Sequence, residues 1–189
     1  MAARALCYPA LVSEQASAAP REPVAPFRVA RLRQDAIFFV IAATVFALDQ
    51  VTKPLIRAWL DPHEAWPDSG WLLHLVNVSN SGAAFGILQG QTAFLVVTSI
   101  VGVAAIVLYY FYPPLEHGLL RAALGLQLGG AAGNLIDRVR FREVTDFINF
   151  DFWPAFNVAD ASISIGVVTI FWFFLVVEAE RLRRKPDRP

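Results

Sequence analysis

The chain has 189 residues, of which 56% are hydrophobic and 17% are charged, and its mean hydropathy is +0.48. About a quarter of the residues in an ordinary soluble domain are charged, so this composition excludes that class and indicates a one-domain integral membrane protein. Sixteen basic residues balance sixteen acidic ones, so the net charge predicts neither nucleic acid nor an acidic partner. A single cysteine, Cys7, excludes a disulfide framework and a cysteine-based metal site.

The first 35 residues are rich in Ala, Pro and Arg and show no periodicity, which predicts a disordered arm. This arm lacks the compact basic, apolar and cleavage-site order of a signal peptide. Cys7 lies in the arm, and we interpret it as an unmodified cysteine rather than a lipidation site, because small residues do not precede it in the usual way.

Four apolar segments are predicted to cross the membrane as helices of about 20 residues. They are residues 36–55, 92–111, 119–136 and 159–179. The third carries Gly125, Gly129 and Gly133 at four-residue intervals, a spacing that packs helices tightly in lipid. The sequence therefore predicts a mainly α, polytopic membrane domain over residues 36–180.

Residues 57–91 are too polar and too broken to span the membrane. Their tryptophans suit the membrane interface, where the polar edge of the ring stays wet. Residues 71–78 alternate enough to predict a short strand. Asn80 and Gly82 then predict a turn, and Asn80 is placed to hydrogen-bond a peptide.

Charged residues near the span ends leave two interpretations open. Asp49 and Lys53 share one helical face, so they form either a self-neutralising pair at the interface or a brace for an active site. Asp137 and Arg138, which follow Asn134 at the end of the third span, form either a salt bridge that fixes the helix end or part of the catalytic group.

Two further carboxylates, Asp146 and Asp160, border an aromatic connection and lie 14 residues apart. A connection of this length can fold back and bring both to one water-filled pocket, which suits general acid–base chemistry at the membrane surface. Asp160 follows Asn157 in the first turn of the fourth span, so a helix-capping role is the alternative for it.

The basic residues predict the orientation, because cytoplasmic segments carry an excess of Lys and Arg. The N-terminal arm and the tail, residues 181–189, are both basic. With four spans, both ends are expected in the cytoplasm, and residues 57–91 and 137–158 meet on the outer face.

Three hydrolytic chemistries can be compared. A Ser–Lys hydrolase needs a serine beside Lys53, and Ser79, Ser81 and Ser162 carry no nucleophile signature. A metal hydrolase needs more ligands than the outer face offers, and none of the three histidines lies at metal-binding spacing from another ligand. An aspartic mechanism needs two carboxylates of which one stays protonated, and no cofactor.

Five ordered motifs resemble those of lipoprotein signal peptidase (signal peptidase II). They are residues 48–53, 80–85, 130–138, 144–148 and 156–160, and the resemblance covers residues 36–180. It implies a monomeric aspartic endopeptidase of the bacterial inner membrane, sensitive to globomycin, that cuts diacylglyceryl-modified prolipoproteins just before the lipidated cysteine. It also implies four transmembrane helices, a small outer β-cradle and an interfacial helix.

By motif match, Asp146 and Asp160 would form the catalytic pair. The resemblance places seven other residues in or beside the pocket or in the polar pair of the first helix: Asn80, Gly82, Asn134, Arg138, Asn157, Asp49 and Lys53. Asp137, within the third motif, is added as a support residue. The chain departs from the family in its long arm, in Ala161 where serine is common, and in a short connection between the two catalytic aspartates.

Two other functional classes compete with a peptidase. A small transporter or channel subunit would use the aspartates as a proton or cation relay, but it predicts polar residues through the full depth of the bundle, and the second and fourth spans are almost wholly apolar. A structural scaffold gives no reason for carboxylates near lipid.

Overall fold

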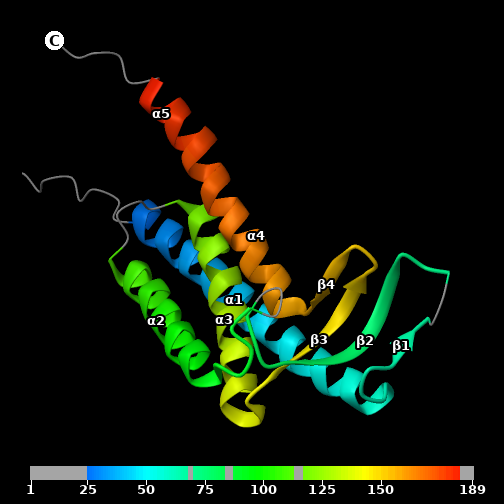
Figure 1. The fold of residues 1–189 in the computed structure, drawn as a ribbon. Helices are drawn as coiled ribbons and strands as arrows, with labels where there is room; N and C mark the ends of the chain where they lie inside the picture. Colours follow the sequence, from blue (N-terminus) through cyan, green and yellow to red (C-terminus); the bar gives the residue numbers. More distant parts are fainter. Residues whose placement is uncertain (1–24, 68–69, 84–86, 113–116, 184–189) are drawn as a thin grey trace, which may run out of the picture.

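The computed structural model describes residues 25–67, 70–83, 87–112 and 117–183. Four long helices form a bundle (Figure 1): α1 (Ala25–Trp59), α2 (Thr92–Phe111), α3 (Gly118–Phe141) and α4 (Val158–Trp172). A π-helical segment, η2 (Phe173–Glu178), and α5 (Ala179–Arg183) continue α4 as one rod. Because α1 begins at Ala25, the last residues of the expected disordered arm are helical; residues 1–24 and Cys7 lie outside the described residues.

Three of the described helices are long and apolar enough to cross a membrane: Gln34–Trp59, Thr92–Phe111 and Val158–Val176. They match the first, second and fourth expected spans. α3 is long enough, at 24 residues, but it carries Arg121, Asp137 and Arg138 and does not meet the same measure of apolarity. It packs against α1, α2 and α4, and its polar residues Arg121, Asn134 and Asp137 are buried.

The predicted close packing of the third segment is confirmed. A Cβ atom on Gly129 would lie 2.5 Å from the Ala42 carbonyl oxygen and 2.8 Å from Val45 Cβ, both on α1. On the other side of α3, a Cβ on Gly130 would lie 2.5 Å from the Ala159 carbonyl oxygen on α4. Glycine lets α3 approach both neighbours at backbone contact.

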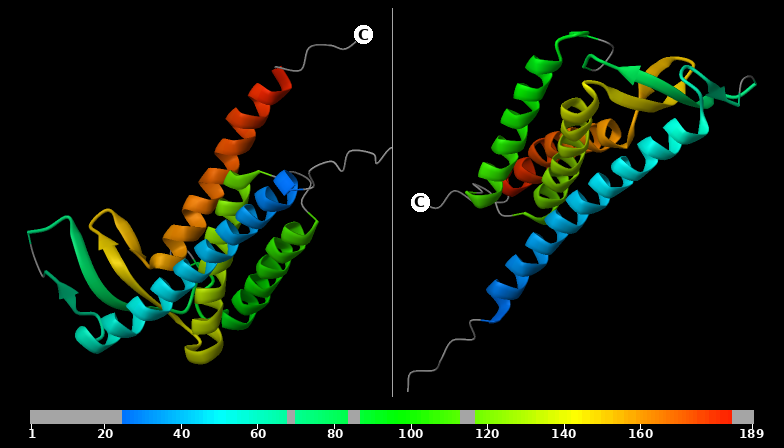
Figure 2. Two further views of the ribbon diagram at one scale, coloured as in Figure 1. Left: turned by 180° about the vertical axis from the view of Figure 1, so that it is seen from behind. Right: turned by 90° about the horizontal axis from the view of Figure 1, so that it is seen from below.

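A four-stranded antiparallel sheet lies beside the end of the bundle, along the last turns of α1 (Figure 2). Its strands, in spatial order, are β1 (Ala65–Trp66), β2 (Leu73–Asn80), β3 (Val144–Phe150) and β4 (Trp153–Phe156). The strand expected at residues 71–78 is therefore present, displaced by two residues. A small core of Ile56, Leu60 and Phe147 joins the sheet to α1.

The described residues between α1 and α2 contain no further helix, so the implied interfacial helix is not seen there. Instead, α1 itself continues past residue 55 to Trp59, with Pro54 inside it. Trp59 contacts Trp66 of β1, with the two rings tilted by 55° and their centroids 5.3 Å apart, and both residues are more than half exposed. Aromatic rings in this position suit a membrane interface without a separate helix.

Candidate active site between the sheet and the helices

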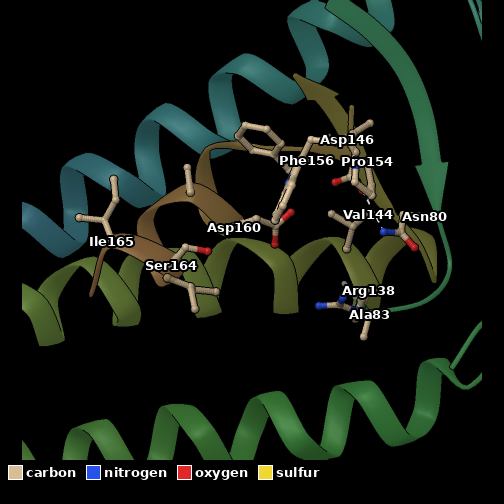
Figure 3. A pocket seen from close by; sticks show the side chains of 14 residues that line it. Asn80, Ala83, Arg138, Val144, Asp146, Pro154, Phe156, Asp160, Ser164 and Ile165 are labelled. Atoms are coloured by element: carbon tan, nitrogen blue, oxygen red, sulfur yellow. Dashed lines mark hydrogen bonds between the residues drawn. The ribbon is translucent and has the colours of Figure 1, made fainter. Parts of the chain in front are cut away.

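A cavity of about 470 Å³ opens where the sheet meets α3 and α4 (Figure 3). Its polar lining includes Asn80, Arg138, Asp146 and Asp160, which lie on four different elements or their ends, together with Ser164 of α4. Much of the remaining wall is β4, Trp153–Phe156. The fold therefore brings the two candidate catalytic carboxylates to one cavity, as the sequence predicts.

Asp146 is held by strand pairing and by two amides. It lies on β3 opposite Val78 of β2, just beyond an irregularity in the pairing, and its side chain is 2% exposed. Asn80 Nδ2 donates to Asp146 Oδ2 at 2.9 Å, and Asn157 Nδ2 donates to Oδ1 at 2.7 Å. Both oxygens are thus oriented by neutral donors.

Burial and, after it, the neighbouring Asp160 carboxylate raise the pKa of Asp146 to about 7. The hydrogen bonds from Asn80 and Asn157 favour the ionised form and act in the opposite direction. Asp146 can therefore hold a proton near neutral pH, as a general acid must.

Asp160 lies in the first turn of α4 and also lines the cavity. Asn157 is the N-cap: its Oδ1 accepts the Asp160 backbone N–H at 3.0 Å, and Asp160 Oδ2 accepts the Asn157 N–H at 3.4 Å, completing a capping box. Asn134 Nδ2 donates to Asp160 Oδ1 at 2.7 Å. The capping and catalytic interpretations of Asp160 are therefore compatible, and the cap residue itself is Asn157.

The two carboxylates share a bridge of asparagine side chains. The fully buried Asn157 side chain donates both to Asp146 and, at 3.3 Å, to Asn134 Oδ1. Asn134 in turn donates to Asp160. The orientation of each aspartate is thereby linked to that of the other.

Behind this bridge lies a buried ionic group of Asp49, Lys53 and Asp137. Lys53 Nζ lies 2.7 Å from Asp49 Oδ2 and 2.7 Å from Asp137 Oδ2, and it donates to Asn134 Oδ1 at 2.9 Å. Lys53 and Asp49 are fully buried, and Lys53 also contacts Asp137, so the pair does not neutralise only itself; its role as a brace for the site stays a prediction.

Asp137 and Arg138 are adjacent in the chain, but their side chains point in different directions and have different partners. The ion pair of Asp137 is with Lys53, so of the two interpretations left open for Asp137 and Arg138, the salt bridge between them is not formed. Successive helical residues point about 100° apart, which turns Asp137 into the bundle and Arg138 towards the cavity. Arg138 donates to the Gly82 carbonyl at 3.2 Å, and the Gly82 N–H donates to Asn80 Oδ1 at 2.9 Å.

Sequence reasoning missed two contributors. Gln50 Nε2 donates to Asp49, to the Gly133 carbonyl and to Asp137, and a polar residue inside an apolar span was the signal for it. The sequence pattern does not predict strand β4, which forms part of the cavity wall, because four residues are too few to show a clear alternation. Ala161, at the position where the resemblance leads one to expect serine, also lines the cavity, while Ser162 donates Oγ to the Val158 carbonyl of its own helix.

A second cavity, of about 510 Å³, lies between α2, α3 and α4 and shares Arg138 and Asp160 with the first. Within the described residues, no group of three or more His, Cys, Asp or Glu side chains is arranged to hold a metal ion. Lys53 is occupied by Asp49, Asp137 and Asn134, and Ser79 donates to Glu143, so these residues do not form a Ser–Lys pair.

Fold and site together define a helical membrane protein with two carboxylates, one buried and one half-buried, in a cavity at one end. The family model described as signal peptidase (SPase) II matches residues 41–176. The chain belongs to the signal peptidase II family, which is a family of peptidases.

Curated relatives agree. A lipoprotein signal peptidase of Moorella thermoacetica is 44% identical over 147 residues, covering 77% of this chain and 97% of the relative. A lipoprotein signal peptidase of Syntrophotalea carbinolica is 46% identical over 144 residues, covering 72% of this chain and 89% of the relative. A bacterial membrane enzyme solved by the in meso method at 2.3 Å resolution superposes with a TM-score of 0.72 at 32% identity, covering 80% of this chain and 94% of that one.

Proposed function

We propose that this protein is a membrane aspartic endopeptidase that removes the signal peptide from diacylglyceryl-modified prolipoproteins, cutting just before the lipidated cysteine. Family membership and the names of the relatives support the substrate class. The observation that carries the mechanism is the arrangement of Asp146 and Asp160, which line one cavity while separate amide donors hold them.

Each aspartate has one role in the proposed reaction. Asp160, at the positive end of α4 and bonded by Asn134, serves as the base, and Asp146 carries the proton. Water gives a proton to Asp160 and its oxygen bonds to the scissile carbonyl carbon, while Asp146 protonates the carbonyl oxygen. The C–N bond then breaks as Asp160 protonates the leaving nitrogen, and a hydroxyl proton of the diol returns to Asp146.

The other site residues support this pair. Asn80, Gly82 and Arg138 line or close the side of the cavity next to the sheet, where they are placed to contact the peptide backbone. Asn134 and Asn157 orient the carboxylates, and the group of Asp49, Lys53 and Asp137 braces them from behind. No cofactor or metal takes part in this scheme.

The membrane arrangement is also part of the proposal. α3 crosses the bacterial inner membrane as a fourth span, shielded by its neighbours, so both termini are cytoplasmic and the cavity faces the periplasm. The protein acts as a monomer and is inhibited by globomycin. The acyl chains of the substrate then stay in the bilayer while the scissile bond reaches water at the outer interface.

Cleavage of a diacylglyceryl-modified prolipoprotein by purified variants tests the function. Asp146→Asn and Asp160→Asn should each lose about 10²–10⁴-fold in rate, because each removes one proton-transfer partner. Asp61→Asn, an exposed aspartate beyond α1, is the matched control and should cleave normally. An active Asp146→Asn enzyme would exclude the proposed pair, and a wild-type protein that cleaves nothing would favour a proton relay.

A further inference from the structure

His74 lies on β2 away from the catalytic pair, and both of its ring nitrogens face acceptors. Nδ1 lies 2.6 Å from the Pro67 carbonyl oxygen, and Nε2 lies 3.1 Å from Asp151 Oδ1. A carbonyl and an ionised carboxylate can only accept, so both nitrogens donate only when the ring carries two protons. The contacts therefore select the imidazolium form.

The surroundings of the ring favour the same state. The pKa of His74 is raised above its ordinary value, chiefly by the bond to Pro67; burial opposes this and Asp151 adds to it. Asp151 is the charged side chain that contacts the ring among the described residues, and the opposing residue on β3 is the uncharged Asn149.

The two acceptors belong to different hairpins. Pro67 follows β1, and Asp151 lies in the turn between β3 and β4. β4 begins at Trp153, pairs with β3 at only two registered positions, and forms a wall of the cavity that holds Asp146 and Asp160. Figure 3 shows Pro154 and Phe156 of this strand beside the catalytic pair.

We infer that His74, as an imidazolium, is a positioning residue that fastens the β3–β4 turn to the end of β1 and so holds the β4 wall in place for substrate. Loss of a ring proton removes one of the two bonds and loosens the wall. The consequence for substrate rests on the proposed function. Because Asp151 is 62% exposed, the effect is that of a solvent-accessible pair, about 2–5-fold.

Two measurements on the purified full-length protein test the inference. By NMR, His74 should titrate above about 6.5, the ordinary histidine value, and Asp151→Asn should lower that midpoint. In cleavage assays, wild-type KM should rise about 2–5-fold between pH 6 and 8.5, whereas His74→Gln should show the higher KM at both pH values. The pH profile of kcat should be the same in both enzymes.

Matched variants separate this role from a structural one. His63→Asn changes an exposed histidine in the turn before β1 and should keep the wild-type KM profile, and Asp151→Glu should retain the pH dependence. A His74 midpoint at or below about 6.5, or the same KM profile in wild type and His74→Gln, overturns the inference. If wild type cleaves nothing, the proposed function fails, and amide hydrogen exchange in β4 then tests the role of His74. Loss of protection of the β4 amides in His74→Gln at pH 6 supports that role. Equal protection in wild type and His74→Gln overturns it.

Discussion

Three asparagine side chains hydrogen-bond the two proposed catalytic carboxylates, as water would in solution. Asn80 and Asn157 donate to Asp146, and Asn134 donates to Asp160, each at 2.7–2.9 Å. An amide does not titrate, so these donors stay in place at every pH. The site can therefore change the protonation state of an aspartate without changing the partners that orient it.

The rate of cleavage should depend on the protonation of Asp146. With a pKa of about 7, Asp146 loses its proton as pH rises, and the proposed acid is then absent. We expect kcat at saturating substrate to fall about tenfold per pH unit above that point. A kcat that stays constant to pH 9 would contradict this assignment. The same measurement on Asp61→Asn should reproduce the wild-type profile.

Replacing Lys53 should strongly destabilise the fold. Lys53→Met leaves the carboxylates of Asp49 and Asp137 buried without their cation, which costs about 3–5 kcal/mol. Thermal unfolding in detergent measures the loss. Adding Asp137→Asn to Lys53→Met removes one orphaned charge and should recover part of the stability, whereas an unchanged melting temperature in Lys53→Met alone would show that the ionic group is not a brace.

At the scale of elements, α3 organises the molecule because it lies between α1, α2 and α4. It supplies Asn134, Asp137 and Arg138 to the site from successive turns, while glycine at its contacts keeps α1 and α4 near. The sheet adds Asn80 and Asp146 through the pairing of β2 with β3. The site thus depends on helix spacing and on strand register together.

Glycines at the helix contacts should not tolerate an added methyl group. Gly129→Ala places a Cβ 2.5 Å from the Ala42 carbonyl and should cost about 1–3 kcal/mol through displacement of α1. Gly102→Ala on α2 is the control, because a Cβ there has no atom within 4 Å, and it should gain up to about 1 kcal/mol from helix propensity. Thermal unfolding in detergent compares the two, and equal effects would argue against backbone contact between α1 and α3.

At the scale of the whole molecule, the proposal of four spans predicts which residues meet the periplasm. In a Cys7→Ser background, we expect Phe152→Cys in the β3–β4 turn to react with a membrane-impermeant thiol reagent in intact spheroplasts. Arg183→Cys at the end of α5 should react only after permeabilisation. If α3 did not cross the membrane, the pattern would be reversed: Arg183→Cys would react in intact spheroplasts and Phe152→Cys would be protected, because α4 still separates the two positions.

Local patterns predicted much of this protein. Hydropathy over about 20 residues is a property of consecutive side chains, so the apolar helices were found, and the glycine spacing on α3 predicted its close packing. Asp146 and Asp160 were paired because their connection is short enough to fold back and because they match family motifs. Strand β2 was found by its alternation to within two residues.

Other features were set by contacts between residues distant in the chain. Asp137 has an adjacent cation in Arg138, yet it pairs with Lys53 of another helix, because helical geometry turns neighbouring side chains to different faces. The sequence pattern also does not predict where α1 begins or that this helix extends to Trp59. No local rule predicts these choices.

The sequence by itself determined the membrane class, the apolar helices and the residue types available for chemistry, since these depend on composition and short-range periodicity. Only the tertiary structure decided that Asp137 is buried against Lys53 while Arg138 faces the cavity, and which amide donates to which carboxylate. The physical reason is that the energy of a buried charge depends on its neighbours in space, and packing brings those neighbours together.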